Sequence, residues 1–134
     1  MTPSGAGLSL PAALRACARG LYPLEAGVGL LINHACWLHR EDFQDEFIHT
    51  GISIADGVTA MAEIDWLAAI TALDVRHLPC SGGEERILRL AASLAGGIPV
   101  SLRDTLTGID HSNIELVITA VLHAWGQRPE PEIP

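Results

Sequence analysis

An apolar pattern in the first third of the chain most constrains how it can fold. Nine residues repeat at alternating steps of four and three: Leu10, Leu14, Cys17, Leu21, Leu24, Val28, Leu31, Ala35 and Leu38. Such steps place all nine on one helical face, which must then be buried. Pro23 either kinks one long helix or divides it. Because the phase survives the proline, we expect two nearly continuous helices, 10–20 and 23–38, with Gly20 at the break.

A second signal interrupts this helical pattern in the middle of the chain. Asp56-Gly57 separates two segments in which apolar and small polar residues alternate, and this arrangement predicts a β-hairpin. A hairpin alone is unstable in water, so it must pack on the helices or pair with another chain. The expected fold class is therefore α+β, a mostly helical single domain of about six or seven helices with one central β-hairpin.

Capping residues mark where the later helices begin. Asp65 and Asp110 are expected N-caps, and Ser81 with Glu84 three residues later has the spacing of a capping box. The last helix is expected to bury one apolar face. That face is formed by Ile114, Val117, Val121, Leu122 and Trp125.

Length and composition favour one globular domain. The chain has 134 residues, and 49% of them are apolar, enough for a hydrophobic core over residues 9–127. Residues 1–8, rich in Thr, Pro, Ser and Gly, are expected to be flexible. The proline-rich tail 128–134 is expected to be disordered.

The charge balance limits which partners the chain is expected to bind, and the targeting and membrane signals bear on its expected location. The net charge is -8, with sixteen acidic residues against eight basic ones and no lysine. Such a surface repels phosphates, so we expect neither nucleic acid nor a membrane surface as partner. No signal peptide or membrane-spanning segment is recognisable, and the three cysteines form no C-x-x-C pair. A cytoplasmic location, no cofactor, and a protein partner or homo-oligomer are expected.

The segment 39–48 predicts a short amphipathic helix that gathers polar side chains. His39, Asp42 and Glu46 fall on one face of that helix, and His49 lies just beyond it. Because imidazole and carboxylate groups hold metal ions, His39, Asp42 and His49 are candidate metal ligands. The alternative is a solvated face with one or two histidines hydrogen-bonded at its edge, since no H-x-x-x-H or H-E-x-x-H motif is present.

A glycine-containing motif suggests an anion site. Residues 81–110 contain Ser-Gly-Gly-Glu-Glu-Arg and, at the end, Thr-Gly-Ile-Asp. This stretch resembles the signature region of ABC-type ATPases, whose Ser-Gly-Gly loop contacts a nucleotide phosphate at a helix N-terminus. The resemblance implies anion contacts by Ser81, Gly82 and Gly83. A chain without lysine cannot contain the G-x-x-x-x-G-K-[ST] loop, so ATP hydrolysis is not expected, and a simple capping box is the alternative interpretation.

These patterns together favour an interaction protein over an enzyme, although they leave open whether the chain has catalytic activity. Trp37 lies beside the apolar stripe, where it can anchor an interface or join the core. The phrases R-G-L-Y-P-L-E-A and W-L-H-R-E-D-F resemble short uncharacterised proteins of GC-rich bacteria, which implies no activity. We expect a non-catalytic interaction or accessory protein that forms a homodimer. The alternative is a small metal- or ligand-binding protein or enzyme that uses side chains near residues 39–49.

Overall fold

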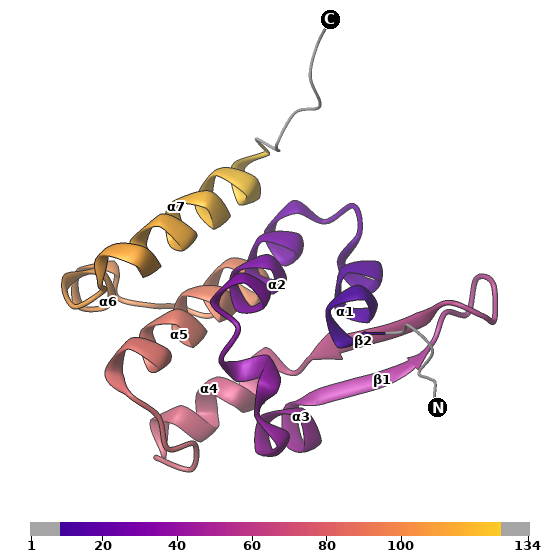
Figure 1. Ribbon diagram of the computed structural model, residues 1–134, viewed down its shortest axis with the longest axis horizontal. Coiled ribbons are helices and arrows are strands. Elements are labelled where there is room, and N and C mark those ends of the chain that lie inside the picture. The colour runs from indigo at the N-terminus through magenta and orange to yellow at the C-terminus, as the bar shows by residue number, and fades with distance from the viewer. Residues whose placement is uncertain (1–8, 127–134) are drawn as a thin grey trace, which may run out of the picture.

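Helices make up most of the protein, which the computed structural model describes over residues 9–126 (Figure 1). The α-helices are α1 (Leu10–Ala18), α2 (Tyr22–His34), α3 (Glu41–Phe47), α4 (Trp66–Asp74), α5 (Gly82–Gly96), α6 (Leu102–Thr107) and α7 (His111–Trp125). A short 3-10 helix, η1 (Trp37–His39), precedes α3, and the strands are β1 (Ile48–Ile52) and β2 (Ala60–Ile64). The expected α+β class is confirmed, whereas the expectations for residues 1–8 and 128–134 lie outside the described residues.

The first apolar stretch forms two helices that fold back on each other. The chain leaves the helical conformation at Arg19, and Gly20 has a φ of 92°, which glycine adopts without strain. As a result α1 and α2 lie side by side (Figure 1). The expected near-continuity of the two helices is therefore wrong. The apolar stripe still holds within each helix and is exposed at Leu21 and Ala35, where helices meet loops.

The helix α2 lies at the centre of the helical part, where it contacts α1, α5 and α7 (Figure 1). Its buried face includes Val28, Leu30 and Leu31. A Cβ atom at Gly27 would lie 2.6 Å from the backbone oxygen of Ala91, so only glycine permits this close approach of α2 to α5. α7 also packs on α2 and contacts α5 as well.

The hairpin is confirmed and packs on the helices mainly through β2, while β1 contacts α3. Ile48 of β1 lies opposite Ile64 of β2 in the antiparallel register, and β2 contacts α1. Asp56 shapes the turn because its carboxylate accepts hydrogen bonds from the backbone N–H groups of Val58 and Thr59, both 2.9 Å. The tip of the hairpin projects away from the helices (Figure 1).

The expected caps are present at three helices. Asp65 accepts a hydrogen bond from the N–H of Ala68, and Asp110 accepts one from the N–H of Asn113. The Ser81 hydroxyl accepts from the N–H of Glu84, whose carboxylate in turn accepts from the N–H of Ser81. None of the helices in residues 9–126 is long and apolar enough to cross a lipid bilayer.

Candidate functional site

The last helix, α7, lies at the edge of the fold and leaves a broad apolar surface uncovered. Its inner side buries Val117 and Ala120 against the rest of the protein. The expected buried face was wrong for three residues, because Val121, Leu122 and Trp125 are 49%, 42% and 78% exposed. α7 is apolar on more than one side, and its contacts with α2 and α5 cover only the inner one.

The exposed apolar residues of α7 form one continuous stripe. We call Ile118, Val121, Leu122 and Trp125 the α7 outer face. Their spacing of three, four and seven positions from Ile118 places them next to one another on the helix surface. The segment 116–126 contains no Asp, Glu, Lys or Arg, so this face carries no fixed charge.

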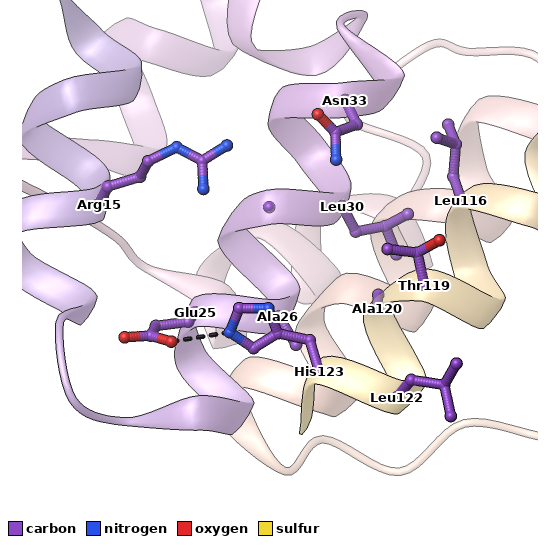
Figure 2. Close-up of a pocket in the computed structure, with 11 residues that line it drawn as sticks. Arg15, Glu25, Ala26, Leu30, Asn33, Leu116, Thr119, Ala120, Leu122 and His123 are labelled. Carbon is purple, nitrogen blue, oxygen red and sulfur yellow. Dashed lines mark hydrogen bonds and ion pairs between the residues drawn. The ribbon is translucent and has the colours of Figure 1, made fainter. Parts of the chain in front are cut away.

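A pocket of about 380 Å³ lies between α1, α2 and α7, beside the α7 outer face (Figure 2). We call it the α1–α2–α7 pocket. Its apolar lining comes from Ala26, Leu30, Leu116, Ala120 and Leu122, and Gly29 also lines it. Its polar lining comes from Arg15, Glu25, Asn33, Thr119 and His123.

One end of the pocket is closed by a pair of polar side chains. His123 Nε2 lies 2.7 Å from Glu25 Oε1, which ties the C-terminal end of α7 to the N-terminal part of α2 (Figure 2). The backbone N–H of Gly20 donates a 2.8 Å hydrogen bond to the other carboxylate oxygen of Glu25. The ring of Tyr22 meets the His123 ring edge-on, with centroids 6.1 Å apart. This end of the pocket is therefore fixed by contacts within the chain.

The other polar side chains of the pocket have no such contacts. Arg15 extends from α1 toward α2, and Asn33 lies near one end of α2 (Figure 2). Within residues 9–126, Arg15, Asn33 and Thr119 make no side-chain hydrogen bond or ion pair. Arg15 is exposed and carries a full positive charge at neutral pH. A cation, an amide and a hydroxyl, all solvent-exposed, thus stand at this pocket without a hydrogen bond from their side chains to residues 9–126.

The candidate metal ligands do not form a metal centre. His39 is the exposed last residue of η1, whereas His49 lies on β1 opposite Glu63. Asp42 is engaged by Arg40 through two hydrogen bonds of 3.0 and 2.6 Å, which hold the pKa of its carboxyl below the usual range. The described part of the chain contains no group of three or more His, Cys, Asp or Glu side chains that could hold a metal ion.

The candidate anion site at Ser81, Gly82 and Gly83 is an N-terminal capping box. The Glu84 carboxylate lies 2.9 Å from the N–H of Ser81, so the chain's own negative charge already sits at this end of α5. This hydrogen bond from the backbone N–H of Ser81, with one from the Cys36 thiol, lowers the pKa of the Glu84 carboxyl. The capping-box interpretation is confirmed, and the geometry gives no support to an anion contact.

Trp37 is a core residue rather than an interface anchor. Its side chain is fully buried, and its ring centroid lies 5.4 Å from that of Phe43. Arg40 covers the indole ring, and the indole Nε1 donates a 2.9 Å hydrogen bond to the backbone oxygen of Glu84. Of the two roles considered for Trp37, the core role is therefore confirmed and the interface role is wrong, and Trp125 is the exposed tryptophan.

Comparisons with known proteins found no relative of this chain. No family model, no curated protein and no solved structure matches this chain. The resemblance of residues 81–110 to the ABC-type ATPase signature region thus gains no support, and function must be inferred from the α7 outer face and the pocket beside it.

Proposed function

We propose that this protein is a non-catalytic interaction protein that associates with a second copy of itself through the α7 outer face. The observation that carries the proposal is the exposure of Ile118, Val121, Leu122 and Trp125 on one side of a single helix. Contiguous apolar patches on a protein surface mark interaction sites, and tryptophan is enriched among residues that dominate binding energy.

The geometry of the stripe suits a helical partner. Positions that repeat at three, four and seven residues are those by which helices pack against one another. In a twofold dimer the same patch serves on both subunits, so one apolar stripe is enough to build the whole interface. A second α7 laid antiparallel across the first offers the shape and chemistry that this stripe needs.

The charge distribution favours a second copy over a charged partner. The net charge of -8 makes most surfaces of two copies repel each other. The segment 116–126 carries no Asp, Glu, Lys or Arg, so two copies can approach there without bringing acidic groups together. A partner recognised by its charge would instead require charged residues on this face.

The other exposed apolar residues are less suited to this role. Ile54 and Val58 at the hairpin tip flank the Asp56 carboxylate. Leu102 and Leu106 are exposed on a short helix that also carries Arg103 and Asp104. Neither group forms an uncharged surface several turns long.

Light scattering after size-exclusion chromatography tests the proposal over a hundredfold range of concentration. We expect the wild-type chain to reach twice its own mass and the variants Ile118→Glu and Trp125→Glu to stay monomeric. Val75→Glu is the matched control, because Val75 is equally apolar and 68% exposed but lies after α4. A wild-type chain that stays monomeric, or an Ile118→Glu variant that still dimerises, would overturn the proposal.

A further inference from the structure

Two glycines in α2 stand in opposite surroundings. Gly27 is required by packing, because a Cβ atom there would lie 2.6 Å from both the Ala91 oxygen and the Ala95 Cβ. Gly29 lies two residues later, and a Cβ atom there would meet nothing within 4 Å. A glycine inside a helix is destabilising relative to alanine. No contact within the described chain explains Gly29, but it lines the α1–α2–α7 pocket, where its missing side chain leaves space.

The polar groups around this space point to an anionic ligand. Arg15 and Asn33 line the same pocket and have no side-chain partner within residues 9–126. A guanidinium binds a carboxylate with two parallel hydrogen bonds, and an amide N–H₂ supplies a further donor. Glu25 closes the other end with its negative charge, so an anion in the pocket is directed toward Arg15.

The apolar residues of the pocket indicate what the part of the ligand beyond its charged group should be like. Ala26, Leu30, Leu116 and Ala120 present apolar surface between the polar groups. A volume of about 380 Å³ lies at the lower end of the range for small-molecule sites, which are mostly apolar with few polar groups. A compact apolar body with one charged group therefore fits this lining.

We propose that the α1–α2–α7 pocket binds a small organic monocarboxylate, with its carboxylate on Arg15 and Asn33. The apolar body lies over Gly29 and against Leu30 and Leu116. This site goes beyond the proposed self-association and does not depend on it. Leu122 belongs to both surfaces, but Arg15, Gly29 and Asn33, which carry this proposal, lie on α1 and α2.

Titration of the full chain with benzoate and hexanoate, followed by the backbone amide signals of nuclear magnetic resonance, tests the proposal. Benzylamine and hexylamine are probes of similar size and opposite charge. We expect saturable binding of at least one carboxylate with shifts at Gly29 and its neighbours, and no saturable binding of the amines. Arg15→Gln should weaken binding at least tenfold, and Arg19→Gln, which changes an α1-flanking arginine outside the pocket, should leave it unchanged.

Two variants at Gly29 test whether the ligand occupies the space beside this residue. Gly29→Leu should abolish binding by filling the pocket, while Gly29→Ala, whose Cβ atom meets nothing within 4 Å, should retain most of it. Thermal melts confirm that each variant is folded. The proposal is overturned if the wild-type chain binds neither carboxylate, if the amines bind equally well, or if Arg15→Gln or Gly29→Leu binds like wild type. A monomeric wild-type chain that binds a carboxylate would reject self-association and leave this site standing.

Discussion

The indole Nε1 of Trp37 donates a 2.9 Å hydrogen bond to the backbone oxygen of Glu84, in the first turn of α5. The carboxylate of the same Glu84 accepts hydrogen bonds from the N–H of Ser81 and from the Sγ of Cys36. One residue therefore joins the capping box of α5 to the segment that follows α2. Trp37 is fully buried, whereas Cys36 and Glu84 are half-buried, so the junction links the core to the start of α5.

We predict that Trp37→Phe lowers the free energy of unfolding by about 1–3 kcal/mol. The change removes a buried hydrogen bond and leaves part of the indole volume empty. Urea denaturation followed by circular dichroism measures the loss. Val75→Ala is the control, since Val75 is 68% exposed, lies after α4 and is outside the α7 outer face, so its replacement should change stability by less than about 0.5 kcal/mol. Equal effects of the two substitutions would contradict the role assigned to Trp37.

A second prediction concerns the reactivity of Cys36. Burial, the hydrogen bond to Glu84 and the charge of that carboxylate together raise the pKa of its thiol to about 11. Only about one Cys36 in a thousand is then a thiolate at pH 8, so iodoacetamide should modify it slowly. Glu84→Gln removes the charge but keeps an amide oxygen for the capping box, and we expect faster modification of Cys36.

Mass spectrometry of the modified peptides measures the rate of modification at each cysteine separately. Cys17 is the internal control, because burial and Glu63 raise the pKa of its thiol and neither changes in Glu84→Gln. Two results would contradict the environment described for Cys36. One is an unchanged rate of Cys36 modification in Glu84→Gln, and the other is a wild-type rate equal to that of the unfolded chain.

Features encoded by neighbouring residues could be predicted from the sequence. The turn at Asp56-Gly57 depends on hydrogen bonds to residues two and three positions later. The caps at Ser81 and Asp110 depend on donors three positions later. Such interactions are local, so they hold in many tertiary settings.

Features that depend on distant contacts could not be predicted in this way. α7 has apolar residues on more than one side, and only its packing against α2 decides that Val117 is buried and Trp125 exposed. The pocket likewise joins Glu25 to His123, which is 98 positions away in the chain. The helical period of the sequence indicates which residues share a face but not which face meets the core.

A third prediction concerns stability in mild acid. Burial lowers the pKa of His34 despite opposing effects of Glu84 and Asp110, and within the described residues its Nδ1 is buried without a hydrogen-bond partner. The folded state thus favours the neutral ring. The stability contributed by His34 is fully present above its unfolded pKa of about 6.5 and is lost as pH falls through the lower folded pKa.

Melting temperatures from about pH 7.5 down to about pH 5 test this expectation, because the window starts above the unfolded pKa of histidine. We expect the melting temperature to fall less with acidification in His34→Gln than in wild type. His111→Gln should behave like wild type, because its ring is 94% exposed. The prediction fails if His34→Gln and wild type lose stability in parallel.

The last prediction contrasts Gly27 and Gly29, which share the helix α2. Gly27→Ala should lower the free energy of unfolding by about 1–3 kcal/mol, because its new methyl group would meet the Ala91 oxygen at 2.6 Å and force α2 away from α5. Gly29→Ala should raise it by about 0.5–1 kcal/mol, because alanine is the better helix residue and its methyl group meets nothing within 4 Å. Urea denaturation of both variants gives the two signs directly. Since helix propensity favours alanine equally at both positions, the difference between the variants isolates the packing at Gly27, and shifts of the same sign would show that Gly27 does not set the approach of α2 to α5.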